Sequence, residues 1–249
     1  MKLELNKIHL GDSYELIKQI QDKSIDCIYT DVPYLYQETG GHKGDLASRI
    51  KRLNYVELGD IRNGIDYSIL NEFVRVLKKV NCFIWCSRDQ ILDIMNYFYD
   101  YKELKPTILV WHKTNPTPQT NGVWLSDLEY CLYFRESGVG KLNDGYELKS
   151  KFYQSSLNVD DKNEWNHPTI KPLELVKRHL LHTTKENDIV LDCFSGSGTT
   201  CVASKELNRR FIGIEIDERY HKISVDRLNG INVHGQTSIF TDFDNRESI

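Results

Sequence analysis

The sequence predicts an α/β fold: a mostly parallel, doubly wound sheet with helices on both faces. Six short apolar runs have the length and composition of buried strands, namely IDCIYT (25–30), NCFIWC (81–86), TILVW (107–111), LEYCLYF (128–134), DIVLDCF (188–194) and RFIGIEI (210–216). Amphipathic stretches with helical spacing alternate with these runs, at residues 13–21, 67–79, 88–99, 172–184, 198–207 and 218–228. Such alternation is typical of βαβ units, in which ligands bind beyond the carboxyl ends of the strands.

Composition sets broad limits on function. The chain has 249 residues and a formal net charge of −4, which argues against a protein that is basic over its whole surface. The N-terminus is too short and too charged for a secretory signal, and no apolar run approaches the roughly 20 residues that a membrane-spanning helix needs. The six cysteines lack the spacing of a metal site. We therefore expect a soluble, cytoplasmic protein with reduced thiols and no bound metal.

Two long segments interrupt the alternation. Residues 37–64 are polar and locally basic, and residues 135–166 are polar with several aromatic side chains. Long irregular segments inside a compact domain usually carry function, with plain surface loops as the alternative. The βα pattern ends near residue 228, so we expect a single domain over residues 1–228 and a tail over residues 229–249.

A glycine-bearing turn, DCFSGSGTT (192–200), follows one predicted strand and opens a predicted helix. A dinucleotide fingerprint and a P-loop both require glycine at position 201, which is cysteine. What remains is a tight turn that lets a ligand approach the backbone closely. Further along the chain, Glu215 ends the next strand, where an acid can accept hydrogen bonds from ribose hydroxyls. The alternative is an ordinary turn followed by an exposed acid.

A second motif, TDVPY (30–34), also follows a predicted strand. Together with DCFSGSGTT, HPTIKP (167–172) and GIEIDERY (213–220), it resembles the motif set of the S-adenosylmethionine-dependent DNA amino-methyltransferases, which modify adenine N6 or cytosine N4. The motif order is similar to the β arrangement of that family, and the resemblance covers most of residues 7–228. It implies a class I methyltransferase fold, Rossmann-like and of the seven-stranded type. The order also implies a circular permutation, in which IHLGDS (8–13) supplies the strand that follows GIEID.

The resemblance implies S-adenosylmethionine as cofactor and assigns residues to it. Asp12 would contact the adenine of the cofactor and Glu215 its ribose. The glycine turn would hold the methionine part, and the HPTIKP segment would lie near the cofactor's carboxylate. The remaining residues implied at the cofactor are Asp192, Phe194, Gly196, Gly198 and Thr199 in the turn, Thr169 and Lys171 in HPTIKP, and Asp31 beside the methyl group.

The chemistry explains why Asp31 and its neighbours occur together. An exocyclic amine is a poor nucleophile because its lone pair is delocalised into the ring, so acceptors must hold its hydrogens. Asp31 can accept one hydrogen bond and the backbone carbonyl of Val32 the other. The resemblance departs at Val32, where proline is usual. The carbonyl survives the change and Pro33 still favours extended geometry at Val32, so we expect activity to be kept with a less pre-organised turn.

The target base must leave the duplex stack, and an aromatic face is needed to hold it. Tyr34 fits that role; Tyr36 is a second candidate, with ordinary packing as the alternative. By the habit of the family, Asp rather than Ser at position 31 favours adenine N6. The alternatives are cytosine N4 methylation and a non-catalytic nucleic-acid-binding subunit, which Val32 leaves open. A small-molecule methyltransferase is disfavoured, because it would need neither D-x-P-Y nor two basic loops.

Double-stranded DNA is the partner that the resemblance implies, in the setting of restriction–modification. The predicted basic contacts are Lys43, Arg49, Lys51, Arg52, Lys113 and Lys149. The segment expected to recognise the target, 135–166, is small. A short target sequence, help from the basic loop 37–64 or a second subunit in a homodimer would each account for that.

The tail carries a last motif, QTSIF (236–240). It resembles the pentapeptide by which bacterial replication proteins bind the sliding clamp. Gln236, Ile239 and Phe240 would make that contact. Packing of the two apolar side chains on the domain's own surface is the alternative.

Overall fold

The computed structural model describes residues 2–35, 64–116, 124–139, 145–157 and 170–231. Within them, eight strands form one sheet in the order β1-β8-β7-β2-β3-β5-β4-β6. The strands are β1 (Lys7–Leu10), β2 (Cys27–Asp31), β3 (Asn81–Cys86), β4 (Thr107–Lys113), β5 (Leu128–Arg135), β6 (Phe152–Ser155), β7 (Ile189–Asp192) and β8 (Arg210–Glu215). Only β5 runs antiparallel to its two neighbours, β3 and β4. The predicted α/β class and mostly parallel sheet are therefore confirmed.

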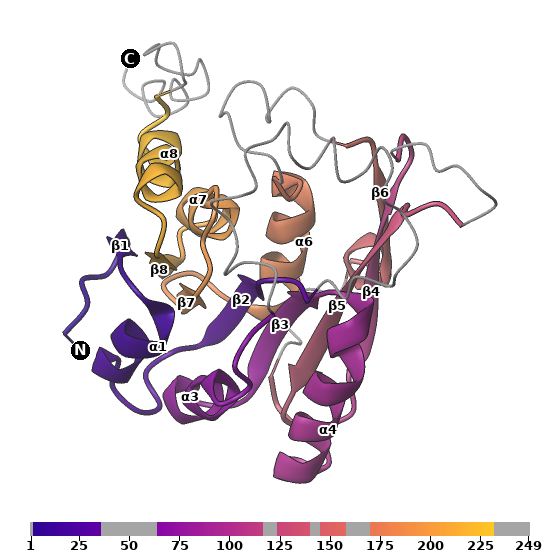
Figure 1. Cartoon of the computed structure of the whole chain (residues 1–249), viewed down its shortest axis with the longest axis horizontal. Helices are drawn as coiled ribbons and strands as arrows, with labels where there is room; N and C mark the ends of the chain where they lie inside the picture. Colours follow the sequence, from indigo (N-terminus) through magenta and orange to yellow (C-terminus); the bar gives the residue numbers. More distant parts are fainter. Residues whose placement is uncertain (1, 36–63, 117–123, 140–144, 158–169, 232–249) are drawn as a thin grey trace, which may run out of the picture.

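Helices cover both faces of the sheet (Figure 1). On one face lie α1 (Ser13–Leu16) with the short turn η1 (Ile17–Gln19), α3 (Ile69–Val76) and α4 (Ile91–Lys102), which η3 (Arg88–Gln90) precedes. On the other face lie α6 (Leu173–Thr183), α7 (Thr199–Glu206) and α8 (Glu218–Leu228). A further short turn, η4 (Glu147–Lys149), comes before β6.

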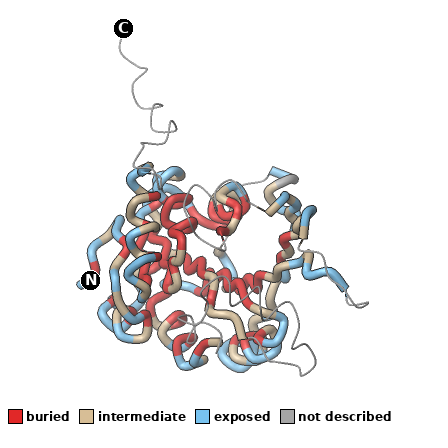
Figure 2. The backbone as a smooth tube through the Cα atoms, turned by 45° about the horizontal axis from the view of Figure 1, so that its top comes forward, coloured by how far each residue is buried: buried red, intermediate tan, exposed pale blue. Residues whose placement is uncertain are grey.

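The core has two main layers because alternate strand residues face opposite sides of the sheet. In β3, Cys82 and Ile84 pack in the cluster with α3 and α4, whereas Phe83 and Trp85 pack in the cluster with α6 and α7. Figure 2 shows these buried segments, in red, through the middle of the molecule. Central strands that are buried on both faces explain the continuous apolar runs of the sequence.

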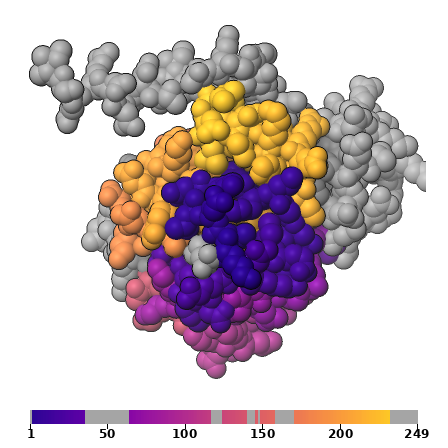
Figure 3. Space-filling model, turned by 90° about the vertical axis from the view of Figure 1, so that its left-hand side faces the viewer, coloured from indigo at the N-terminus to yellow at the C-terminus, as the bar shows by residue number. Residues whose placement is uncertain are grey.

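The chain closes its sheet with strands from the two ends of the described domain. β1 pairs in parallel with β8, with Leu10 opposite Glu215. The ring of His221 in α8 shares a 2.9 Å hydrogen bond with the carbonyl of Ile8. Figure 3 shows the N-terminal segment, in indigo, against α8, in yellow. The predicted permutation, with IHLGDS beside GIEID, matches this pairing.

One strand was not predicted. β6 lies inside the 135–166 segment and pairs in parallel with β4 at the edge of the sheet. Its sequence, FYQS, is exposed or half-buried throughout, so it lacks the apolar run that marks a central strand. The described part of this segment thus extends the main sheet.

Two composition-based expectations concern cysteines and membranes. All six cysteines are free and buried, as expected of reduced thiols. None of the helices in the described ranges is long and apolar enough to cross a membrane. In the same ranges, no cluster of His, Cys, Asp and Glu side chains has the geometry of a metal site.

Candidate active site

The predicted cofactor residues gather at the carboxyl ends of four neighbouring strands. Asp12 follows β1, Glu215 ends β8, Asp192 ends β7 and Asp31 ends β2. These four strands are consecutive neighbours in the sheet, and three strand spacings span about 14 Å. Along these strand ends, the order of Asp12, Glu215 and Asp192 matches the order of adenine, ribose and methionine in an extended S-adenosylmethionine, whose methyl group is on the sulfur between the ribose and the methionine chain. The residues therefore fit such a cofactor.

The glycine turn between β7 and α7 takes a shape that glycine permits. Gly196 has φ +49° and Gly198 has φ +76°, in the left-handed region that other residues avoid. A Cβ atom on Gly198 would lie 2.9 Å from the Cβ of Ser224 in α8. The turn is therefore fixed both by backbone conformation and by the close approach of a helix.

Glu215 connects the turn to the end of β8. Its Oε2 accepts a 2.7 Å hydrogen bond from the amide of Gly196, and its Oε1 accepts a 2.9 Å bond from the amide of Asp217. Burial raises the pKa of this carboxyl, and the amide donors oppose the rise. Each oxygen keeps a second lone pair, which is what two ribose hydroxyls would require.

The other predicted cofactor residues have contacts within the protein. Asp12 caps α1 by accepting a 2.8 Å bond from the amide of Tyr14. Phe194 packs edge-on against the ring of Tyr14, with 6.5 Å between ring centroids. Thr199 accepts a 2.7 Å bond from the guanidinium of Arg227, so its side chain faces α8.

Asp192 lies deep beneath the turn. Its side chain is buried, and Oδ1 accepts hydrogen bonds from the hydroxyl of Thr30 at 2.8 Å and the amide of Phe194 at 3.2 Å. Burial raises its pKa to about 7, against the lowering effect of these donors. The side chain thereby links the end of β7, next to the glycine turn, to the end of β2, where Asp31 lies.

Two acceptors stand without a donor at the end of β2. The Oδ1 atom of Asp31 is buried and has no hydrogen-bond partner in the structure. No described residue donates to the carbonyl of Val32, whose own amide donates to the Trp85 carbonyl at 3.1 Å. Buried acceptors are usually satisfied, so these two atoms are open to a donor from outside the described residues. These are the two acceptors that the sequence predicts for the target amine.

The turn that follows is held by a buried glutamine. Gln90 donates a 3.0 Å hydrogen bond from Nε2 to the carbonyl of Pro33. Its Oε1 accepts from both the amide and the hydroxyl of Ser87. The side chain of Val32 is itself buried in the core with α3 and α4. Packing and this glutamine thus fix a turn that lacks the usual first proline.

Lys171 lies at the centre of the catalytic end. Its ammonium group donates to Asp31 Oδ2 at 2.6 Å, to Glu129 Oε2 at 2.7 Å and to the hydroxyl of Tyr34 at 3.2 Å. Glu129 also pairs with Lys113, with 2.6 Å between Oε1 and Nζ. The side chains of Lys171, Lys113 and Glu129 are only 11, 15 and 18 % exposed.

The charged groups of this cluster shift one another's pKa values. Partial burial raises the pKa of Asp31, while Lys171 opposes and Glu129 reinforces the rise. Burial alone would raise the pKa of Glu129 and lower that of Lys171. The two ammonium groups instead hold the pKa of Glu129 at about 2, and the two carboxylates keep the pKa of Lys171 above its ordinary value. Glu129 and Lys171 are therefore both charged at neutral pH.

Sequence reasoning missed Glu129 and Gln90, and it did not predict the ion pairs that Lys113 and Lys171 make. Attention to residues just after strands overlooks Glu129, because β5 is antiparallel and brings its first residues to the edge where parallel strands end. Lys113 was predicted to contact DNA; in the structure its ammonium pairs with Glu129, and the DNA contact stays a prediction. Lys171 was predicted near the cofactor's carboxylate, and its three donor hydrogens already face acceptors here.

Several predicted residues lie outside the described ranges: Tyr36, Lys43, Arg49, Lys51, Arg52, Thr169, Gln236, Ile239 and Phe240. Their roles stay predictions. Lys149, in η4, is described and exposed, as a phosphate contact would require.

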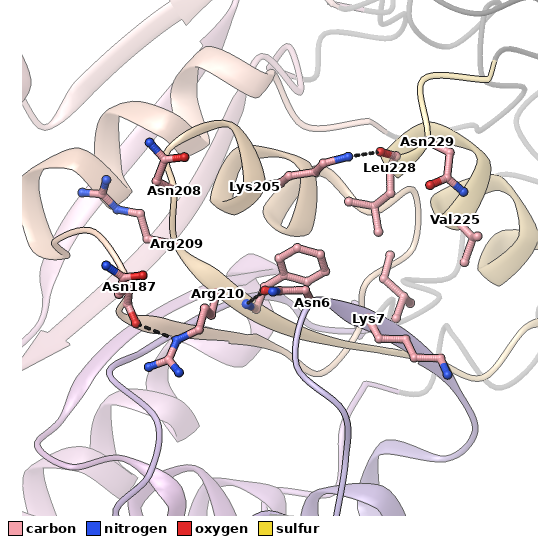
Figure 4. Close-up of a pocket in the computed structure, with 12 residues that line it drawn as sticks. Asn6, Lys7, Asn187, Lys205, Asn208, Arg209, Arg210, Val225, Leu228 and Asn229 are labelled. Carbon is pink, nitrogen blue, oxygen red and sulfur yellow. Dashed lines mark hydrogen bonds between the residues drawn. The ribbon is translucent and has the colours of Figure 1, made fainter. Parts of the chain in front are cut away.

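A separate cavity of about 470 Å³ lies at the amino ends of β1, β7 and β8 (Figure 4). Its basic side chains are engaged by the protein: Lys205 donates to the carbonyl of Leu228 and Arg210 to that of Asn187. The cavity is at the opposite end of these strands from Asp192 and Glu215, so it is not the predicted cofactor site.

Comparison with known proteins identifies the family. A family model described as DNA methylase, for N6 and N4 methyltransferases, matches residues 25–226. The chain belongs to this family. The predicted resemblance to S-adenosylmethionine-dependent DNA amino-methyltransferases is thereby confirmed, and the chain is a DNA methyltransferase.

Individual relatives of this DNA methyltransferase agree. It is 30% identical to the Type II methyltransferase M2.LlaDCHI of Lactococcus lactis subsp. cremoris, over 88% of this chain and 87% of the relative. It is 29% identical to the Type II methyltransferase M2.DpnII of Streptococcus pneumoniae, over 89% of each chain. Among solved structures, the M1.HpyAVI–SAM complex matches with a TM-score of 0.65 and 26% identity, over 90% of this chain and 98% of that one.

Proposed function

We propose that this methyltransferase transfers a methyl group from S-adenosylmethionine to the N6 amine of an adenine turned out of double-stranded DNA. The observation that carries the proposal is the pair of acceptors at the end of β2, Asp31 Oδ1 and the Val32 carbonyl, to which no described residue donates. An exocyclic amine has two hydrogens and would satisfy both acceptors. Adenine is preferred to cytosine on the family habit of Asp at position 31.

The two acceptors would act on the amine nitrogen directly. Holding both hydrogens favours a pyramidal nitrogen, whose lone pair is then free to attack a methyl carbon. Bound S-adenosylmethionine supplies that methyl group on a positively charged sulfur. As the new N–C bond formed, the bond from the methyl carbon to sulfur would break and leave the sulfur as a neutral thioether. The nitrogen would gain positive charge, which the carboxylate of Asp31 would stabilise at short range, and would then lose one of its protons to solvent. The pair is positioned before the reaction, so little reorganisation is needed.

Tyr34 supplies the aromatic face for the base in this proposal. Its hydroxyl accepts the hydrogen bond from Lys171 at 3.2 Å, which limits rotation of the ring. The Lys171 ammonium also lies 5.5 Å from the ring centroid. A ring held in this way offers a fixed stacking surface next to the two acceptors.

The cofactor would lie along the carboxyl ends of β1, β8 and β7. Asp12, Glu215 and the turn of Gly196 and Gly198 would bind its adenine, ribose and methionine parts in that order. The hydrogen bond from Gly196 to Glu215 supports joint binding, because the ribose acceptor and the methionine turn are mechanically linked. The domain over 1–228 would act as one unit, since strands from Lys7 to Glu215 share one sheet.

The remaining partner roles are part of the same proposal. The basic segment 37–64 and Lys149 would contact DNA phosphates, and the 135–166 segment would contribute to target recognition. A cytoplasmic restriction–modification role accords with the Type II relatives. A homodimer and a clamp contact through Gln236, Ile239 and Phe240 rest on sequence alone.

Identifying the methylated nucleoside tests the proposal. Cells expressing the wild type or Asp31→Ala would be compared by nucleoside mass spectrometry and by long-read sequencing of their DNA. We expect N6-methyladenine at a defined sequence with the wild type and none with the variant. N4-methylcytosine would replace the adenine assignment with the alternative. No mark from a folded, cofactor-binding wild type would favour the non-catalytic subunit.

A further inference from the structure

The charged cluster around Lys171 has an alternating order. Lys113, Glu129, Lys171 and Asp31 follow one another as cation, anion, cation and anion, with contacts of 2.6, 2.7 and 2.6 Å. The four charges sum to zero. Only Asp31 has an oxygen left over, Oδ1, that faces no donor.

Neutrality matters because Lys113, Glu129 and Lys171 are largely removed from water, while the Asp31 side chain is about one-third exposed. A buried ammonium that faces a single carboxylate binds it strongly and so reduces its ability to accept from another donor. Lys171 instead divides its hydrogens among Asp31, Glu129 and the hydroxyl of Tyr34. Glu129 thereby takes part of the attraction that Lys171 would otherwise direct at Asp31.

We propose that Glu129 is a positioning residue for methyl transfer: it holds Lys171 between two carboxylates, so that Asp31 remains a strong acceptor for the target amine. The ammonium of Lys113 balances the negative charge of Glu129, and the cluster as a whole is neutral. Neither Glu129 nor Lys113 touches a reacting atom. The proposal rests on the amine-acceptor role of Asp31 in the proposed function.

The position of Glu129 in the fold supports this role. The residue is at the start of β5, next to the end of β3, and β5 pairs with both β3 and β4. Glu129 pairs with Trp111 of β4, and its neighbour Tyr130 pairs with Cys86 at the end of β3. Lys113 ends β4, and Lys171 lies two residues before α6. Glu129 and Lys113 thus come from two paired strands, as a site with fixed geometry requires, and Lys171 comes from the segment that leads into α6.

The groups that face Asp31 determine how its acid titration responds. They are Lys171 before α6, Glu129 on β5, Tyr34 after β2, Cys86 on β3 and Asp192 on β7. Removing the negative charge of Glu129 lowers the pKa of Asp31, because a like charge no longer opposes its ionisation. Removing the positive charge of Lys113 acts in the opposite direction through Glu129 and Lys171.

Three variants of the full-length enzyme test the proposal: Glu129→Gln, Lys113→Met and the double variant. Single-turnover methyl transfer would be measured from pH 5 to 9 with saturating DNA and S-adenosylmethionine. For Glu129→Gln we expect a rate roughly 10- to 100-fold lower at pH 7.5, with the dissociation constants of DNA and cofactor changed less than about threefold. The acid limb of its pH profile moves down by about one pH unit.

For Lys113→Met we expect the acid limb of the pH profile to move to higher pH. The double variant should return towards the wild-type profile, because the cluster is neutral again. Compensation of this kind does not arise from general damage to the fold. Glu136→Gln is the matched control: Glu136 directly follows the other end of β5 and pairs with Lys102 at 2.6 Å. Its pH profile should equal that of the wild type.

Four results would overturn the proposal. The first two are acid limbs of the pH–rate profile that do not shift in either single variant, or that shift in the same direction in both. The third is a double variant whose rate is reduced by the product of the two single reductions. The fourth is a Lys113→Met variant in which only DNA binding and its salt dependence are weakened. Should Glu129→Gln not fold, the upward shift in Lys113→Met still decides. Asp31→Asn distinguishes failure of the proposed function from failure of the role of Glu129. An active Asp31→Asn variant refutes the proposed function. An inactive Asp31→Asn variant, together with unshifted pH profiles of the Glu129 and Lys113 variants, refutes only the role of Glu129.

Discussion

Substituting Gly198 by alanine tests the shape of the cofactor turn. Gly198 has φ +76°, and a left-handed conformation costs an L-residue roughly 1–2 kcal/mol. The new Cβ would lie 2.9 Å from Ser224 Cβ, 3.3 Å from Ser224 Cα and 3.3 Å from Ile8 Cδ1. Overpacking of this kind costs about 1–3 kcal/mol. The free energy of unfolding should therefore fall by roughly 2–5 kcal/mol, a large share of the roughly 5–15 kcal/mol of a typical domain.

Urea denaturation would measure the change in stability, and calorimetric titration with S-adenosylmethionine would measure binding. We expect weaker cofactor binding as well, because relief of the contact must shift the turn or α8. Gly145→Ala is the control: its Cβ would meet Leu148 only at an ordinary 3.5 Å, and no left-handed φ is involved. A Gly198→Ala variant with the stability and affinity of the wild type would refute this account of the turn.

Two further predictions concern Val32 and Asp192. Val32→Pro should keep methyl transfer within about threefold, since the carbonyl remains, but it loses the 3.1 Å bond from the Val32 amide to Trp85 and about 1 kcal/mol of unfolding free energy; a folded but inactive variant would contradict the acceptor role of that carbonyl. The raised pKa of Asp192, about 7, means that the folded state keeps a proton between pH 4 and 7 that the unfolded state has lost, so wild-type stability falls as pH rises through this window. Asp192→Asn should escape that fall and gain roughly 4 kcal/mol relative to the wild type between pH 4 and 8. The measurement is made without cofactor, and parallel stability curves would contradict the prediction.

Much of the fold could be predicted because buried central strands leave a clear signal. Runs such as NCFIWC are apolar on both faces, and the structure buries β3 completely. The edge strand β6 gave no such signal because FYQS is largely in contact with solvent. The pairing of β1 with β8 was accessible only through the order of the motifs, since periodicity does not specify which strands are neighbours.

Some residues of the site could likewise be predicted from the sequence, and others could not. Asp31, Glu215 and the glycine turn were found because each follows a parallel strand, where ligands bind. Glu129 was missed because it is the second residue of an antiparallel strand, and short apolar runs do not encode strand direction. The pairing of Lys171 with Asp31 joins residues from two distant parts of the chain, and only the folded structure shows that contact. Val32 appeared to weaken the turn, but the structure uses both its amide and its buried side chain.

Single-turnover methyl transfer by Asp31→Asn is the most direct test of the central claim, that an ionised Asp31 holds the target amine. The asparagine keeps the size of the side chain and removes its charge. With DNA and S-adenosylmethionine bound as tightly as in the wild type, we expect a rate at least roughly 100-fold lower, as for the loss of a group that stabilises transition-state charge. A rate within about threefold of the wild type would contradict the claim.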